Sequence, residues 1–192
     1  AVARHLAGLG LSPPAILATD GARGFLLLED LGDDLFARLL ERAPEREETL
    51  YAAAVDLLAE LHRHPPPPGM PRYGPEQMAP LAALAVQWYL PGIGAAVPSD
   101  ATARLTDSVA AALTSHAAET PVLTLRDYHA ENLIWRPERA GAARVGLLDF
   151  QDAAAGHPGY DLVSLLADAR RDVAPELRDA MAARYRAATG RD

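Results

Sequence analysis

Three polar side chains between Arg126 and Phe150 have the types and spacing that phosphoryl transfer uses. Asp127 and Asn132 have four residues between them, and Asp149 ends the second of two apolar runs that follow. Phosphoryl transfer needs one carboxylate to receive the proton of the attacking hydroxyl, and oxygen ligands to hold magnesium on the phosphates. The chemistry predicted from these residues is therefore transfer of a phosphoryl group to a hydroxyl.

A β-hairpin would bring these side chains together. Leu133–Trp135 and Val145–Leu148 are two strand candidates, joined by a segment that contains Pro and Gly. If they pair about Ala140–Gly141, Asn132 faces Asp149, and such partners lie about 5 Å apart, close enough to share one ion. Asp and Asn before a strand are also common turn and capping residues. The spacing, the two strands and the terminal Asp-Phe together favour the functional interpretation.

Composition restricts the class of protein. A chain of 192 residues, 49% of them hydrophobic, can form about one domain with a sizeable core. A net charge of −8 argues against nucleic-acid or anionic-membrane partners. No apolar run approaches the roughly 20 residues of a membrane span. No secretory segment is visible, which favours the cytoplasm; the oligomeric state stays open.

The residues that are absent exclude other sites. All 18 basic residues are arginine, so this sequence holds no Gly-Lys-Ser/Thr phosphate loop and no lysine that could pair with the α- and β-phosphates. Without cysteine there is no disulfide or thiolate metal site. His62 and His64 are two apart on a predicted helix and point in different directions, so we expect surface histidines rather than metal ligands.

Hydrophobic periodicity predicts an α+β protein in which a helical body carries a small hairpin. Helices are expected over residues 1–9, from Asp33 or Asp34 as cap to 41, and over 46–64, 76–90, 101–118, 160–170 and 175–188. Strands are expected over 15–18, 24–28 and 122–125, besides the two strands of the hairpin. In the helix 46–64, one face collects the apolar residues Leu50, Ala54, Leu57, Leu58 and Leu61.

The motifs resemble those of the aminoglycoside phosphotransferase and choline kinase family. The similar segments are LRDYHAENLIW at 125–135, GLLDFQD at 146–152, GHPGYDLVSL at 156–165, FLLLEDLG at 25–32 and LLAELHR at 57–63. Within the family, Trp88-Tyr89-Leu90 and the run Asp149–Val173 look most like the bacterial anomeric kinases of N-acetylmuramate and N-acetylglucosamine, which act in cell-wall sugar recycling.

The resemblance implies a protein-kinase-like fold. Residues 1–32 would be a remnant of the nucleotide-binding N-lobe with the hinge, and residues 33–192 the helical C-lobe with the catalytic hairpin. The glycine-rich strands and the phosphate-anchoring lysine of the family would precede Ala1. The isolated chain is accordingly expected to be weakly active or inactive.

The resemblance also implies roles for individual residues, with ATP and Mg²⁺ as cofactors. Asp127 would be the catalytic base, Asn132 and Asp149 would hold magnesium, and Asp161 would brace the catalytic loop from a helix start. Backbone groups of the hinge would bind adenine, at Glu29, Asp30 and Leu31.

Three further residues are candidates for contact with the acceptor. Trp88 and Tyr89 could line a sugar pocket, because aromatic faces pack on pyranose rings, or they could be ordinary core residues. His129 would either approach the substrate or brace the loop. Leu125 stands where the family usually has a histidine that supports loop geometry, a change expected to affect rate more than the kind of reaction.

The function that the resemblance implies is ATP- and magnesium-dependent phosphorylation of a small hydroxylated molecule, an amino sugar. Two alternatives remain open. An aminoglycoside antibiotic would suit the acidic chain as a cationic acceptor, and a non-catalytic, pseudokinase-like remnant would suit the missing lysine and Leu125.

Overall fold

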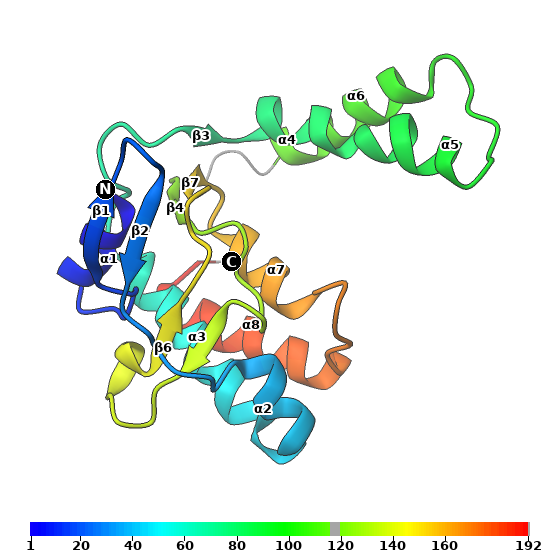
Figure 1. The fold of residues 1–192 in the computed structure, drawn as a ribbon. Helices are drawn as coiled ribbons and strands as arrows, with labels where there is room; N and C mark the ends of the chain where they lie inside the picture. Colours follow the sequence, from blue (N-terminus) through cyan, green and yellow to red (C-terminus); the bar gives the residue numbers. More distant parts are fainter. Residues whose placement is uncertain (116–119, 192) are drawn as a thin grey trace.

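The computed structural model of the protein describes residues 1–115 and 120–191. Figure 1 shows a body of helices packed around short strands, with a two-stranded hairpin at one edge. A helical arm, residues 75–114, projects from the other side of this body. The architecture is α+β, as the sequence predicts, and no described helix is long and apolar enough to cross a membrane.

Helices make up about half of the described chain. The α-helices are α1 Val2–Gly8, α2 Phe36–Arg42, α3 Glu47–Leu61, α4 Pro75–Ala82, α5 Leu90–Gly92, α6 Ala101–Thr114, α7 Gly159–Leu166 and α8 Pro175–Thr189. Single turns of other helix types are the 3₁₀ helices η1 Pro44–Arg46 and η3 Gly141–Arg144 and the π-helix η2 Ala85–Tyr89. Positions 116–118 of the helix predicted over 101–118 lie outside the described residues.

Three predicted helix ends are wrong, one of them the end of α3, which is at Leu61 rather than residue 64. The cap of α2 is Leu35, with no capping side-chain hydrogen bond, rather than Asp33 or Asp34. The chain is still extended there, because Leu35 forms an isolated β-bridge with Ile134. Helix α7 ends at Leu166 rather than near residue 170, and a turn follows from residue 167.

The strands form three small sheets. β1 Ile16–Asp20 pairs antiparallel with β2 Phe25–Leu28, and β5 Leu133–Trp135 pairs antiparallel with β6 Val145–Leu147. The third sheet has the order β3-β7-β4, with β3 Arg72–Tyr73, β7 Ala154–Gly156 and β4 Val122–Thr124. The sequence does not predict β3 and β7, because two or three small or isolated residues carry no alternating pattern.

The register of the β5–β6 hairpin differs from the prediction by one residue. Leu133 pairs with Leu147, and the Leu148 N–H donates to the Asn132 carbonyl at 3.0 Å, so Asn132 lies opposite Leu148 rather than Asp149. The 3₁₀ turn η3 occupies the second half of the connection, which is therefore not symmetric about Ala140–Gly141. Asp149 comes two residues after the end of β6, one position beyond the Leu148 that lies opposite Asn132.

Helix α3 is the centre of the core. All five residues of its predicted apolar face are completely buried, which confirms the periodicity. α3 contacts α7, α8, η3 and β6, so it joins the C-terminal helices to the hairpin. Fully burying each leucine stabilises the fold by roughly 1.5–3 kcal/mol before opposing entropy is counted.

His62 contradicts the expectation of a surface histidine, because its side chain is only 5% exposed. It caps the end of α3, and a hydrogen bond of 2.6 Å joins its Nδ1 to the hydroxyl of Tyr185 in α8. Burial lowers the pKa of His62 to about 3. His62 therefore belongs to the contact between α3 and α8.

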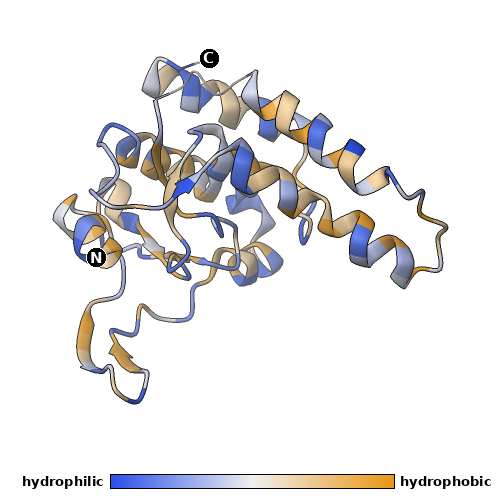
Figure 2. Cartoon of the chain, turned by 90° about the horizontal axis from the view of Figure 1, so that it is seen from above, coloured by the Kyte–Doolittle hydropathy of each residue, from blue (hydrophilic) through white to orange (hydrophobic). Residues whose placement is uncertain are grey.

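The β1–β2 hairpin exposes apolar side chains. Figure 2 shows it as a largely hydrophobic ribbon that extends away from the body. Leu17, Phe25 and Leu26 are 62%, 66% and 62% exposed. The boundary predicted between residues 32 and 33 falls just after this hairpin and stays a prediction.

Candidate active site

Residues 125–132, here called the catalytic loop after their predicted role, connect β4 to β5, and Asp161 holds them in place. This residue lies in the first turn of α7 and is completely buried. Its Oδ2 accepts the Leu125 N–H at 2.6 Å, and its Oδ1 accepts the Arg126 N–H at 2.9 Å. Burial raises the pKa of Asp161 to about 7, while the two N–H donors act in the opposite direction. These hydrogen bonds are the brace that the resemblance implies.

Arg126 has an unusual backbone conformation immediately before Asp127. Its φ is +73°, a left-handed value that costs energy for a residue with a side chain. Its guanidinium lies over the ring of Tyr73 in β3, 4.4 Å from the ring centre. The N–H bond to Asp161 and the stacking on Tyr73 together hold the chain in this conformation, and so orient the half-buried Asp127 that follows.

Asn132 is fixed by the loop in a way that leaves its oxygen available. Its Nδ2 donates to the Asp127 carbonyl at 3.0 Å and lies 3.2 Å from His129 Nε2. With the amide nitrogen turned into the loop, Oδ1 has no hydrogen-bond partner among the described residues. His129 is 6% exposed and contacts Asn132, which favours the bracing role over direct contact with substrate.

Asp149 is exposed where the chain leaves β6, with φ at +55°. Its carboxylate has no ion pair or hydrogen bond within the described parts of the chain. The N–H of the neighbouring Leu148 donates to the Asn132 carbonyl. The Asn132 side chain and the Asp149 carboxylate therefore start from neighbouring positions at the ends of the two strands of the β5–β6 hairpin. Oxygen-only donors of this kind fit Mg²⁺, which keeps several waters and substrate phosphates as its other ligands. Within the described chain no cluster of three or more His, Cys, Asp or Glu could hold a metal alone.

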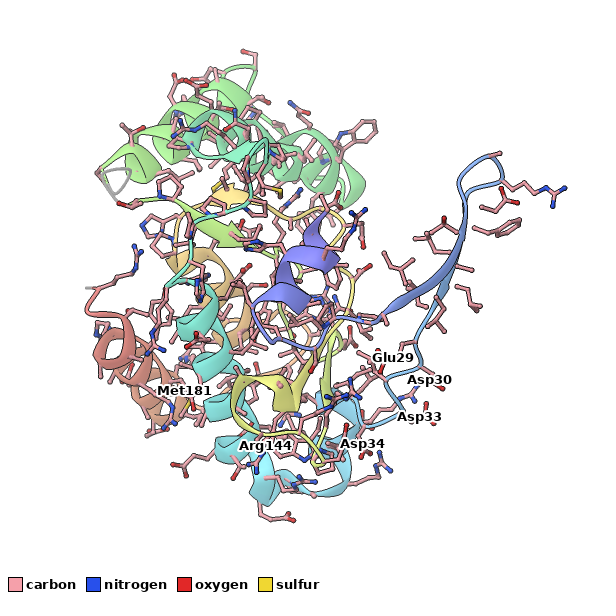
Figure 3. All side chains as sticks on the ribbon, turned by 90° about the vertical axis from the view of Figure 1, so that its left-hand side faces the viewer. Glu29, Asp30, Asp33, Asp34, Arg144 and Met181 are labelled. Atoms are coloured by element: carbon pink, nitrogen blue, oxygen red, sulfur yellow. The ribbon has the colours of Figure 1, made fainter. Side chains whose placement is uncertain are left out.

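The predicted hinge residues connect the β1–β2 hairpin to α2. Figure 3 shows Glu29 and Asp30 at the base of the β1–β2 hairpin. The Glu29 N–H donates to the Ala15 carbonyl at 2.8 Å, and its carboxylate accepts the Ala15 N–H at 3.0 Å and pairs with Arg136 at 3.5 Å. Asp30 Oδ1 accepts the Gly32 N–H at 2.8 Å. The Glu29 carbonyl and the Leu31 N–H have no partner in the described structure and remain able to bind an adenine edge.

Trp88 and Tyr89 lie on the arm, in the π-helix η2. Their side chains are 74% and 65% exposed, so the core-packing alternative is wrong. Figure 1 places this part of the arm outside the helical body that carries the catalytic loop. Contact of these rings with a sugar therefore stays a prediction.

The sequence interpretation missed a polar contact beside the catalytic loop. Arg170, in the turn after α7, lies 3.3 Å from Glu131, measured from Nε to Oε2. Local sequence gives no signal for this pair, because 38 residues separate the partners and only the packing of α7 brings them together.

A helical lobe with a braced catalytic loop and a metal-suited hairpin defines the class of protein-kinase-like phosphotransferases. The aminoglycoside phosphotransferase APH(2'')-Ib with ADP bound has a TM-score of 0.65 at 20% identity, over 98% of this chain and 67% of that chain. APH(3'')-Id from Streptomyces rimosus, in complex with ADP and streptomycin, has a TM-score of 0.65 at 22% identity, over 99% and 73%. These structures confirm the predicted fold.

The chain belongs to the Phosphotransferase enzyme family, whose family model matches residues 1–192. An N-acetylmuramate/N-acetylglucosamine kinase of Caulobacter vibrioides is 44% identical over 98% of this chain and 54% of its own length. A kinase of the same name from Pseudomonas putida is 32% identical, over 88% of this chain and 48% of its own length. The chain spans about half the length of the curated relatives it matches.

Proposed function

We propose that this chain forms the acceptor- and metal-binding part of an ATP- and Mg²⁺-dependent kinase that phosphorylates N-acetylmuramate and N-acetylglucosamine. The observation that carries the proposal is the geometry of the catalytic loop. The Asn132 amide nitrogen is bonded to the Asp127 carbonyl, and its amide oxygen is left free near the end of β6, two residues before Asp149. The 44% identity to a kinase of these two sugars supports the choice of acceptor.

In this proposal the protein acts mainly by positioning. Asp127 accepts a hydrogen bond from the acceptor hydroxyl and receives its proton as the phosphoryl group is transferred. Asn132 Oδ1 and the Asp149 carboxylate would hold the magnesium ion, which when bound neutralises charge on the transferring phosphoryl group. The Glu29 carbonyl and the Leu31 N–H would receive the adenine.

The proposal includes the setting of the reaction. Residues 1–32 would belong with the nucleotide-binding lobe and residues 33–192 with the lobe that binds the acceptor. The two sugars are cell-wall components, so the reaction would serve their recycling in the cytoplasm.

A substrate panel tests the proposal. The complete gene product would be incubated with labelled ATP and either N-acetylglucosamine, N-acetylmuramate or kanamycin, with and without Mg²⁺. We expect Mg²⁺-dependent transfer of label to the two sugars. Transfer to kanamycin alone would replace the amino-sugar proposal with an antibiotic phosphotransferase. No Mg²⁺-dependent binding of ATP by calorimetry would support a non-catalytic remnant.

A further inference from the structure

Arg170 is a cation held at a fixed position beside the catalytic loop. Asp168 Oδ1 accepts both its backbone N–H, at 3.0 Å, and its Nη1, at 3.1 Å. The next residue, Arg171, donates to Glu47 of α3 at 2.8 Å, and Val173 is buried in the core. The turn after α7 is therefore anchored on both sides of Arg170, so the position of the guanidinium follows from the packing of the body.

The second partner of Arg170 belongs to the catalytic loop. Glu131 lies between Asp127 and Asn132 in the chain, and its carboxylate contacts Arg170. The Asp168 side chain is 2% exposed, whereas Arg170 and Glu131 are 53% and 56% exposed. The Asp168 contact is thus the more shielded of the two. The Glu131 contact is exposed to solvent and contributes little to stability, so another anion can replace the Glu131 carboxylate.

We propose that Arg170 recognises the carboxylate of an acidic acceptor, an inference that rests on the proposed function. N-acetylmuramate is N-acetylglucosamine with a lactyl ether, and the lactyl carboxylate is the difference between the two sugars. A guanidinium binds a carboxylate through two parallel N–H···O bonds. Arg170 pairs with Glu131 in this structure. When N-acetylmuramate binds, its lactyl carboxylate replaces the Glu131 carboxylate as the partner of Arg170.

The surrounding charge gives Arg170 a second effect. The chain carries a net charge of −8, and Asp127, Glu131 and Asp149 lie on or beside the catalytic loop, which also holds the cation Arg126, stacked on Tyr73. An anionic acceptor would be repelled by this field unless a fixed cation offsets it. A neutral acceptor would not be repelled. Arg170 is therefore expected to decide between the two sugars and to leave the transfer step itself unchanged.

The test compares kcat/KM for the two sugars in the complete gene product. R170Q is expected to lower kcat/KM for N-acetylmuramate by about tenfold or more, mainly through KM, as for loss of a charge-assisted pair. For N-acetylglucosamine the change should stay within about threefold. R170K, which keeps the charge without the fork, should recover part of the loss. R104Q removes an exposed arginine paired with Asp100 on the arm and should change neither value.

Each other outcome contradicts the inference in its own way. Equal losses on both sugars, with no recovery in R170K, would show that Arg170 only supports the loop. Unchanged kinetics on both sugars would place Arg170 outside the acceptor site. If the wild-type protein phosphorylates neither sugar, the proposed function itself fails, and this is seen before any variant is made.

Discussion

At the scale of single residues, the candidate site depends on backbone groups that buried side chains hold in place. Asp161 contributes no atom to the proposed chemistry, yet its two oxygens take the N–H groups of Leu125 and Arg126. Those bonds stabilise a left-handed residue directly before Asp127. The conformation of the loop is therefore set from α7, beneath the site, rather than by the residues that would contact substrate.

Asp161→Ala is expected to destabilise the protein and to slow the reaction. The substitution leaves two buried N–H groups without an acceptor, which costs about 2–4 kcal/mol in the free energy of unfolding. Urea unfolding measures this cost, and kcat measures the effect on the loop. Asp179→Asn, on α8, serves as a control and should change neither. A loss below about 0.5 kcal/mol would show that the brace is not needed.

Asp149→Asn is expected to weaken magnesium binding. An amide in place of the carboxylate keeps the size of the side chain and removes the charge that attracts the ion. The Mg²⁺ concentration that gives half-maximal activity should rise on the order of tenfold. Asp100→Asn, on the arm, is the matched control. An unchanged Mg²⁺ requirement in Asp149→Asn would remove Asp149 from the proposed metal site.

At the scale of elements, the hinge and the catalytic hairpin meet at Gly146. A Cβ added there would lie 3.0 Å from Leu31 Cδ1 and 3.3 Å from Ile134 Cβ. Glycine therefore lets the hinge segment pack directly on β6. The same packing fixes Leu31, whose N–H is proposed to bind adenine, relative to Asp149, two residues after β6.

Gly146→Ala tests this contact. We expect a loss of about 1–3 kcal/mol in the free energy of unfolding, the usual cost of overpacking, together with a higher KM for ATP. Gly8→Ala, where an added Cβ meets nothing within 4 Å, is the control and should be close to neutral. Equal stability of both variants would mean that the hinge relaxes at no cost.

Elements with strong local patterns could be predicted from the sequence. The apolar face of α3, the strands β1, β2 and β4–β6, and the strand-flanked positions of Asn132 and Asp149 all follow from periodicity and motif spacing. The hairpin register could not be predicted, because it depends on how η3 fits into the connection. β7 consists of Ala154-Ala155-Gly156 and exists because β3 and β4 flank it, which is tertiary rather than local information.

At the scale of the whole molecule, contacts between distant segments were the least predictable part. His62 looks like a surface residue beside Arg63 and His64, but distant segments, α8 and β4, pack against it. Glu131 and Arg170 are likewise brought together by the fold. These contacts join the C-terminal helices to the catalytic loop and to α3, so the stability of the site depends on the entire helical body.

The buried His62 predicts acid sensitivity of the folded state. Burial lowers its pKa from 6.5 to about 3, so between these values the unfolded chain binds a proton that the folded chain does not. The contribution of His62 is full above pH 6.5 and is lost as the pH falls toward 3, at up to about 1.4 kcal/mol per pH unit. His62→Asn should flatten this dependence in urea unfolding between pH 7 and pH 5. An unchanged slope would contradict the assignment.

Phosphoryl transfer by the complete gene product, with Asp127 replaced, tests the central claim most directly. Labelled ATP, Mg²⁺ and N-acetylglucosamine would be used with Asp127→Ala and with Asp152→Ala, an exposed carboxylate in the segment after Asp149. Loss of a general base predicts that kcat falls by about 100-fold or more in Asp127→Ala, while Asp152→Ala stays close to wild type. Turnover of Asp127→Ala within about tenfold of wild type would contradict the account.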